Sequence, residues 1–379
     1  MENFHETKKS AAVLKHAILD QYASPFVGMT GKYSQDHRVA FVDGYAGPGR
    51  YGDDEEGSGA LLLRKAKELV GIPRTVELHF VEDDPATVER LRAVIAEEGE
   101  GVTATVTDGD IAAHLPHLLQ TCAGVPLFVY LDPCGLVIPF DQVVQVFNRP
   151  GGLGAPATEV LINFSAVSLR RIAGHLTSDK AIEKTLERMD QVCGGDWWRQ
   201  VWLDSLPDKE AAEEAVVQGY AERLSKRAKS GHWVIDVRPR ADLKPIYYLV
   251  FASRHHAGME TFGEAASLGL ERWRRYNASM AARKTLFGGD NSWEAAFKQQ
   301  EATLKARWVD GIAQRLTEEL AKGHAFRVID RYTEVFGDAV GLARGLHLRA
   351  AIKKVLAAGK TSTNPVGEKN MYELRLVPA

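Results

Sequence analysis

Four apolar segments of this chain each lead into an acidic side chain, and this repetition is the feature of the sequence best suited to chemistry. The four acids are Asp43, Glu82, Asp110 and Asp132. Short apolar segments that alternate with helical patterns predict a parallel α/β sheet. Open sheets of this kind bind ligands at the carboxyl ends of their strands, so we expect the four carboxylates to gather along one edge.

The first acid opens a loop that is rich in glycine. Residues 38–50 read Arg-Val-Ala-Phe-Val-Asp-Gly-Tyr-Ala-Gly-Pro-Gly-Arg, which predicts a buried strand followed directly by the loop. Glycine has no Cβ, so the backbone of such a loop can approach a ligand closely. The pattern predicts a cradle for a nucleotide cofactor, although a glycine-rich turn alone is equally typical of a structural loop. The candidate cofactor-binding residues here are Asp43, Gly44, Tyr45, Ala46, Gly47 and Gly49.

The second and third acids suit the other parts of a nucleotide. Glu82 ends the strand that begins near Val76, and its carboxylate can accept hydrogen bonds from both ribose hydroxyls. Its negative charge favours a cofactor without a 2′-phosphate. Asp110 follows a third strand over residues 102–106. Its carboxylate could accept a hydrogen bond from the amino group of adenine, while Ile111 packs on the ring.

These features resemble a known class of enzymes. The long glycine loop and the Asp-Pro after the fourth strand look like S-adenosyl-L-methionine-dependent methyltransferases of the Rossmann-like class. Residues 12–19, Ala-Val-Leu-Lys-His-Ala-Ile-Leu, together with residues 41–51 resemble the three-Cys-motif partner (TcmP) family. They are also similar to the start of bacterial large-subunit rRNA adenine-N6 methyltransferases. The TcmP resemblance continues through residues 57–61, 131–135, 159–164 and 248–255, and so covers most of the chain.

The resemblance implies a doubly wound α/β fold, with an antiparallel pair formed by its last two strands, and S-adenosyl-L-methionine as cofactor. It sets Lys15 and His16 against the methionine carboxylate and the mouth of the active site. It also implies a protein partner that carries the three-Cys motif. The three cysteines of this chain, Cys122, Cys134 and Cys193, have no Cys-x-x-Cys spacing and indicate neither a disulfide framework nor a zinc site. The family name does not fix the substrate.

The fourth strand ends in Asp132-Pro-Cys-Gly135, which determines the expected chemistry. In amino-methyltransferases of nucleic acids, an Asp-Pro-Pro-Tyr motif accepts the protons of the target amino group and stacks an aromatic ring on the base. The resemblance therefore implies catalytic roles for Asp132 and Pro133. The aromatic residue is absent here, since Gly135 takes its position, and Tyr45, Phe140 or Phe164 could supply the ring instead.

Two further residues of this region are candidate substrate contacts, namely Cys134 and Asn163. Because Cys134 follows a proline, it also allows a second mechanism, the attack of a thiolate on a cytosine ring as in cytosine-C5 methyltransferases. No surrounding acid and base motif for that chemistry is visible, and related TcmP sequences typically carry Asp-Pro-Phe-Gly here, which implies that the thiol is dispensable.

Composition predicts a large core with a smaller appendage. The chain has 379 residues, of which 45% are hydrophobic and 26% charged. It contains no apolar run near the length of about 18 residues that spans a bilayer, and no signal-peptide core, so we expect a cytoplasmic protein without a membrane partner. We expect residues 1–290 to form the methyltransferase-like domain, with a helical insertion at about 169–229. Residues 291–379 should form a helical linker and a winged-helix-like domain.

The end of the chain is basic although the whole chain carries a net charge of −3. Residues 339–379 contain seven Lys or Arg and two Glu. A helix over residues 346–357, and two strands over 360–363 and 371–377 joined by a basic tip, predict a winged-helix module. Such modules bind nucleic acid or proteins. The candidate contacts to nucleic acid are Lys353, Lys354 and Lys360.

The sequence therefore supports two hypotheses. The first is methyl transfer from S-adenosyl-L-methionine to an amino group, with a nucleic-acid base as the expected acceptor. The second is an interaction subunit that keeps the cofactor fold and serves a three-Cys-motif partner, with little or no methyl transfer of its own. Acids at all four strand ends favour the enzyme, and the missing aromatic favours the interaction subunit.

Overall fold

The computed structural model describes residues 2–52, 55–178, 182–284 and 292–379. The chain divides into two compact units, Met1–Thr261 and Phe262–Ala379. The domain boundary predicted after residue 290 lies outside the described residues. No helix in the described part of the chain is long and apolar enough to cross a membrane.

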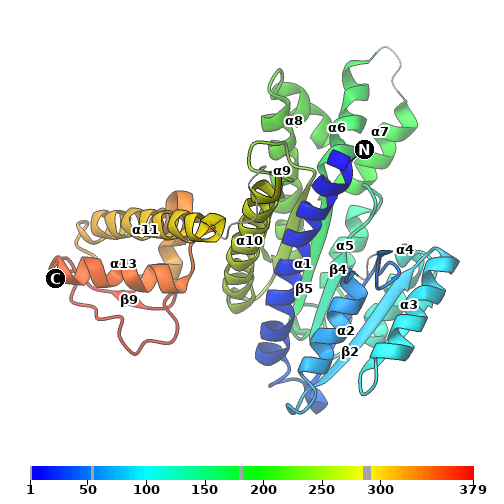
Figure 1. The fold of residues 1–379 in the computed structure, drawn as a ribbon, viewed down its shortest axis with the longest axis horizontal. Coiled ribbons are helices and arrows are strands. Elements are labelled where there is room, and N and C mark those ends of the chain that lie inside the picture. The colour runs from blue at the N-terminus through cyan, green and yellow to red at the C-terminus, as the bar shows by residue number, and fades with distance from the viewer. Residues whose placement is uncertain (1, 53–54, 179–181, 285–291) are drawn as a thin grey trace. The chain divides into compact units, whose positions relative to one another are not determined.

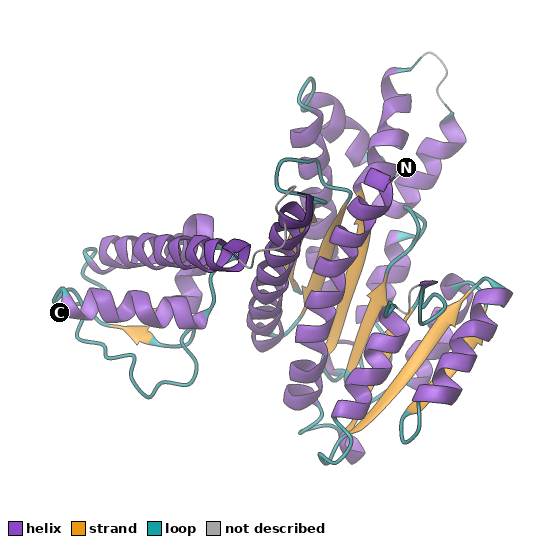
Figure 2. Cartoon of the chain, viewed as in Figure 1, coloured by secondary structure: helices purple, strands orange, loops and turns teal. Residues whose placement is uncertain are grey.

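The first unit is built on a seven-stranded sheet with the order β3-β2-β1-β4-β5-β7-β6 (Figures 1 and 2). Strands β1 to β5 are parallel, and β7 lies antiparallel between β5 and β6. This is the strand order of the Rossmann-like methyltransferase sheet, so the predicted fold class and its antiparallel pair are confirmed. The strands are β1 Arg38–Asp43, β2 Thr75–Glu82, β3 Thr103–Asp108, β4 Leu127–Leu131, β5 Thr158–Ser165, β6 Gly231–Val237 and β7 Tyr247–Ser253.

β1 and β4 are neighbours in the sheet. β2 and β3 follow on the far side of β1, and β5 follows on the far side of β4, so the order of the strands reverses between β1 and β4. In open α/β sheets the crevice beyond such a reversal, at the carboxyl ends of the strands, is the usual ligand site. Asp43 ends β1 and Asp132 directly follows β4. Two of the four predicted carboxylates therefore lie at this point of reversal, which we call the switch point.

Helices cover both faces of the sheet. On one face Tyr22 and Phe26 of α1 pack on Phe41 and Phe128, with ring centroids 5.6–5.7 Å apart for three of these contacts. On the other face alternate residues of the same strands, such as Val42 and Val129, join one large apolar cluster. The helices of this unit are α1 Glu2–Thr30, α2 Ser58–Glu68, α3 Pro85–Glu98, α4 Ile111–Thr121, α5 Phe140–Phe147, α6 Ala166–Ala173, α7 Glu183–Cys193, α8 Trp197–Asp204 and α9 Lys209–Ala228, followed by the start of α10 His256–Lys284.

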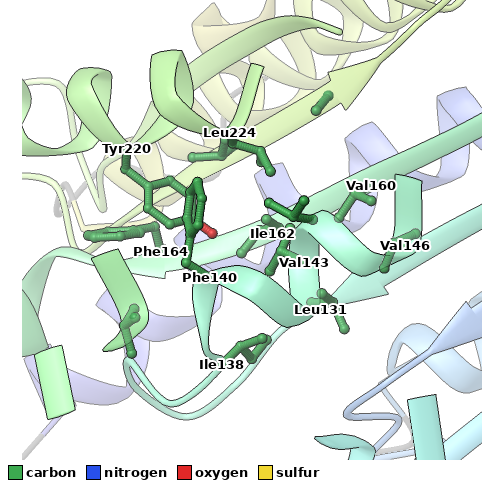
Figure 3. Close-up of a cluster of buried hydrophobic side chains, with 14 of the residues drawn as sticks. Leu131, Ile138, Phe140, Val143, Val146, Val160, Ile162, Phe164, Tyr220 and Leu224 are labelled. Atoms are coloured by element: carbon green, nitrogen blue, oxygen red, sulfur yellow. The ribbon is translucent and has the colours of Figure 1, made fainter. Parts of the chain in front are cut away.

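The large cluster explains why the strands read as continuous apolar runs, since both faces of a parallel sheet are buried. The predicted helical insertion at about 169–229 corresponds to α6 through α9 and is confirmed. Its helices close the cluster, with Trp198 and Trp202 buried inside it. Figure 3 shows Phe140 and Phe164 packed around Tyr220 of α9.

The second unit contains the rest of α10, then α11 Ser292–Leu320, β8 Phe326–Arg327, α12 Tyr332–Phe336, α13 Gly345–Ala357 and β9 Arg375–Leu376. The predicted helix at 346–357 is confirmed as α13, and Gly359 follows it with φ +65°. Residues of α10 belong to this unit through ion pairs such as Arg274 with Glu301 of α11.

The predicted hairpin at the end of the chain is only partly correct. β9 pairs antiparallel with β8, and residues 360–363 form no regular strand but make one antiparallel bridge, Thr361 with Pro378, to the end of the chain. Side chains replace much of their backbone ladder: the Thr361 hydroxyl donates to the Val377 carbonyl at 2.6 Å, and the Thr363 hydroxyl accepts from the Val377 N–H at 2.9 Å. Hydroxyl groups that bond to nearby backbone compete with strand pairing, which accounts for the difference.

A buried arginine holds the turns at the amino edge of the sheet. Arg149 is 2% exposed and donates to the Cys122 and Val125 carbonyls at 2.5 and 2.6 Å, and to the Pro156 carbonyl at 3.1 Å. Arg149→Met would leave these buried carbonyls unpaired, so we expect a loss of about 3–5 kcal/mol in the free energy of unfolding.

Urea unfolding measures this loss. The control is Arg92→Met on α3, where an exposed arginine pairs with Glu89, and we expect a change within about 0.5 kcal/mol. Equal stabilities for the two variants would contradict the structural role of Arg149.

Candidate active site

The candidate site lies where the ends of β1, β4 and β5 meet beneath α1. Asp132 is its centre, because one carboxylate oxygen accepts from the Lys15 ammonium of α1 and the other accepts from the Asn163 side-chain amide at 2.5 Å. Burial alone would lower the pKa of Lys15, but the Asp132 carboxylate outweighs it and raises that pKa above its ordinary value. Lys15 is therefore an ammonium ion at neutral pH, and three predicted site residues are in direct contact.

The seat of α1 fixes this ion pair. The Tyr247 hydroxyl donates to the Ala11 carbonyl at 2.7 Å, and the Lys15 ammonium lies 5.8 Å from the centroid of the Tyr247 ring. The neighbouring His16 is half-buried, and burial together with the charge of Lys15 lowers its pKa to about 4. His16 is consequently a neutral imidazole at neutral pH.

Asp43 is fully buried at the end of β1. Its Oδ1 accepts from the Tyr45 N–H at 3.2 Å, but its Oδ2 has no hydrogen-bond partner among the described residues. Burial raises the pKa of Asp43 to about 7, in spite of hydrogen bonds from Ser58 and Tyr45 that lower it. A buried acceptor without a partner is costly, so this atom suits a ligand that brings a donor.

The glycine loop is tied to β2 by Glu82. The Gly47 N–H donates to Glu82 Oε2 at 2.9 Å, while the N–H groups of Asp83 and Asp84 donate to Oε1 at 3.1 Å. Gly47 has φ +62°, a left-handed conformation that favours glycine. The carboxylate thus shapes the loop and retains part of its capacity to accept hydrogen bonds.

Two glycines of the loop serve packing within the protein. A Cβ on Gly44 would lie 2.8 Å from Leu131 Cδ2 and 2.9 Å from Ile111 Cγ1. A Cβ on Gly49, where φ is +76°, would lie 3.1 Å from Leu91 Cδ1. Ala46 is also buried, and its N–H donates to the Val81 carbonyl. The close approach that sequence reasoning assigned to a ligand is made here by neighbouring side chains.

The third acid, Asp110, is exposed at the start of α4. It caps that helix by accepting from the Ala112 N–H at 2.9 Å. Ile111 is only 3% exposed, so little of it is available to pack on a ring. Tyr45 lies close by and is half-buried; burial raises its pKa, and the charges of Asp110 and Asp83 raise it further.

The segment after Asp132 differs from the expected arrangement. The Pro133 carbonyl accepts from the Gly135 N–H at 2.8 Å, and Gly135 has φ +147°. Cys134 is an exposed free thiol. Phe140 and Phe164 cannot present a ring to a substrate, because both are buried with centroids 5.6 and 5.1 Å from that of Tyr220.

Sequence reasoning missed Tyr51. This residue is 51% exposed, and its hydroxyl lies 3.0 Å from the position that a Cβ on Gly47 would occupy. Burial raises the pKa of Tyr51; the charge of Lys15 lowers it, and those of Asp132 and Asp43 raise it. An exposed aromatic ring at the mouth of the site could have been suspected from its position two residues after Gly49.

The predicted nucleic-acid contacts belong to the second unit. Lys353, Lys354 and Lys360 are all exposed, and Lys354 pairs with Asp310 of α11 at 2.5 Å. Arg349 is different, because its guanidinium donates to the carbonyls of Pro365 and Glu368 and thereby holds the 364–370 turn against α13.

Comparisons with known proteins do not show a family for this chain. No protein-family model matches the chain, and no curated protein matches it in sequence, so the TcmP resemblance stays a prediction. Among solved structures the chain is similar to the O-methyltransferase from Bacillus cereus in complex with SAH, at 10% identity over 66% of this chain and 90% of that chain, with a TM-score of 0.32.

Two further structures are comparable. The O-methyltransferase TomG from Streptomyces achromogenes, involved in tomaymycin synthesis and in complex with SAM, is 14% identical over 64% of this chain and 88% of that chain, with a TM-score of 0.30. The SAH-bound methyltransferase PaMTH1 from Podospora anserina is 10% identical over 64% and 86%, with a TM-score of 0.31. At such scores it is the strand order that identifies the fold.

The buried carboxyl of Asp43 should make the stability of the folded protein depend on pH. Its pKa is raised from 3.8 to about 7, so the folded protein keeps a proton that the unfolded chain releases above pH 3.8. The stability of the wild type therefore falls across this window as pH rises. Asp43→Asn cannot ionise at this position. Its free energy of unfolding should therefore rise relative to that of the wild type by on the order of 1–3 kcal/mol between about pH 4 and pH 7.

Urea unfolding over this pH range measures the difference. Asp141→Asn, at an exposed aspartate on α5, is the control and should show no comparable gain. A constant difference between Asp43→Asn and the wild type at all pH values would mean that Asp43 is ionised throughout.

Proposed function

We propose that this chain transfers a methyl group from S-adenosyl-L-methionine to an amino group of a nucleic-acid base. The observation that carries the proposal is the set of acceptors at the switch point. Asp43, Asp132 and Asn163 lie at the ends of three adjacent strands, and within the described residues Asp43 Oδ2 and Asn163 Oδ1 have no hydrogen-bond partner. Buried acceptors of this kind suit a ligand rich in donors.

The residues present fit the proposed cofactor, which supplies an electrophilic methyl group on a sulfonium centre. The carboxylate of Asp43 suits the ammonium group, Glu82 suits the ribose hydroxyls, and Asp110 suits the adenine amino group. Lys15 suits the methionine carboxylate, and the neutral His16 beside it adds no charge that would oppose the sulfonium. These assignments follow the TcmP resemblance and the chemistry of the side chains.

Asp132 and Asn163 retain enough hydrogen-bond acceptor positions to receive both protons of a substrate amino group. A carboxylate offers about four acceptor positions, and Lys15 and Asn163 occupy two of those of Asp132. Because the Pro133 carbonyl already accepts from Gly135, Asn163 Oδ1 is the better second acceptor. Tyr51 supplies the ring face that Gly135 lacks. Orientation of the amino nitrogen by such contacts accounts for much of the rate in transfers of this type.

The second candidate is an interaction subunit with little or no transfer. It is favoured by the same ion pair, since Lys15 and Asn163 both hold the Asp132 carboxylate in this structure. It is favoured also by the missing aromatic at Gly135. A three-Cys-motif protein would then be the partner.

One set of measurements separates these functions. Calorimetry should detect binding of S-adenosylmethionine or S-adenosylhomocysteine to the full chain. With labelled cofactor, one of total RNA, DNA or protein from the host should acquire label, and RNA or DNA is expected. Asp132→Ala should abolish transfer while changing cofactor affinity by less than about tenfold, because its proposed contact is to the acceptor.

Cys134→Ser is the matched control on the same turn and should remain active. Inactivity of Cys134→Ser would replace amino transfer with C5 chemistry. Cofactor binding without label in any fraction would favour the interaction subunit, and absence of cofactor binding would refute the methyltransferase.

The basic end of the chain generates a separate prediction. We propose that α13 and the following turn grip a polyanion in the manner of a winged helix. Replacement of Lys353, Lys354 and Lys360 by Ala should weaken RNA or DNA binding and flatten the dependence of log affinity on log salt by about 0.7–0.9 per lost phosphate contact. The control replaces Lys298, Arg307 and Lys322, which are exposed on α11 or just after it. Equal salt slopes for the two triple variants would assign the basic end to a protein partner instead.

A further inference from the structure

A cavity of about 400 Å³ lies at the edge of the sheet opposite Asp43 and Asp132. It is bounded by the end of α1 at Met29, by the turns that enter β4 and β5 at Pro126 and Pro156, and by the start of α10 at Gly258. Its volume is at the small end of the range for small-molecule sites. It lies wholly within the first unit and has no part in the proposed methyl transfer.

An acidic side chain reaches this cavity from the sheet. Glu159 is the second residue of β5, is 1% exposed and belongs to the cavity lining. Gly258 leaves it next to the cavity, since a Cβ there would lie 2.1 Å from Glu159 Oε1. Any other residue at position 258 would displace the carboxyl group.

The carboxyl group is held by neutral donors. The Tyr22 hydroxyl donates to Oε2 at 2.5 Å and the Ser253 hydroxyl donates to Oε1 at 2.9 Å. Burial raises the pKa of Glu159 to about 7, and these two hydrogen bonds lower it only in part. A buried carboxylate ordinarily has a cationic partner, and among the ion pairs of the described residues Glu159 has none.

The nearby arginines do not serve as that partner. Arg149 donates hydrogen bonds to the Thr158 hydroxyl and to backbone carbonyls. Arg254 donates to the carbonyls of Ala228 and Gly152. Neither arginine therefore donates to Glu159, which has no cationic partner among the described residues. The rest of the lining combines apolar residues and glycines, among them Met29, two prolines and Ala257, with the polar residues Thr30, Tyr33, Ser34 and His255.

We propose that this cavity binds a small apolar molecule that carries one ammonium group, which donates to Glu159. The carboxylate uses one position for Tyr22 and one for Ser253, so it can accept further hydrogen bonds. The ammonium ion supplies the missing counter-charge, and the apolar walls receive the rest of the ligand. A neutral analogue lacks the charge-assisted hydrogen bond and binds more weakly.

Benzylamine is the probe for this site, and benzyl alcohol is its neutral counterpart of nearly the same shape. Titration of the full chain, followed by NMR or calorimetry, should show one benzylamine site and at least about tenfold weaker binding of benzyl alcohol. Glu159→Gln should remove this preference for the amine.

Ala257→Phe tests the site without touching the buried carboxyl, because Ala257 is exposed at the rim. It should weaken benzylamine binding by at least about tenfold by filling the entrance. Ala96→Phe, at an exposed alanine of α3, is the matched control and should bind as the wild type does. Equal affinities for the two probes, wild-type affinity in Ala257→Phe, or no binding of benzylamine would each overturn the proposal.

Discussion

The ion pair between Lys15 and Asp132 is the contact on which the arrangement of the site depends. It joins residues 117 positions apart in the sequence and ties the first helix to the switch point of the sheet. A partly buried ion pair contributes little by itself, since desolvation offsets much of the attraction. Its effect is one of position. The aromatic packing of Tyr22 and Phe26 seats α1 on the sheet, and Lys15 then fixes the orientation of the carboxylate.

Asn163 completes that orientation from the next strand. Its amide nitrogen donates to Asp132, so its oxygen is turned away from the aspartate and has no partner among the described residues. Asp43 presents a second oxygen of the same kind from β1. Unpaired buried acceptors destabilise the folded state, and they persist where a ligand requires them. The carboxyl end of the sheet therefore presents two buried oxygens that can accept from a ligand. Glu159 at the amino edge differs, since Tyr22 and Ser253 each donate to one of its oxygens.

Much of this fold could be predicted from the sequence because its strands are continuous apolar runs with an acid after several of them. The insertion and α13 could also be placed, since their helical patterns end at clear stops such as Gly359. The contacts of individual side chains could not. Phe140 and Phe164 turn into the core because Tyr220 of a distant helix fills the space between them, and sequence spacing contains no record of that helix. Gly44 is required by Leu131 and Ile111, which also come from separate segments. β9 pairs with β8, a partner from a distant segment, while the hydroxyls of Thr361 and Thr363 bond to Val377 in place of part of the predicted hairpin ladder.

The division of charge between the two units constrains how a nucleic acid could be bound. Residues 1–261 contain 28 Lys or Arg and 37 Asp or Glu, whereas residues 262–379 contain 19 and 13. The first unit therefore repels a polyanion over distances comparable to the Debye length of about 8 Å at physiological salt. Phosphate contacts supply most of the affinity in nonspecific binding, so a nucleic-acid acceptor would depend on the second unit for its affinity. The switch point would then need only to select an amino group presented to it, which is a task for hydrogen bonds and ring packing. An acceptor without phosphates would place no such demand on the basic unit, and its affinity would have to come from the mouth around Tyr51.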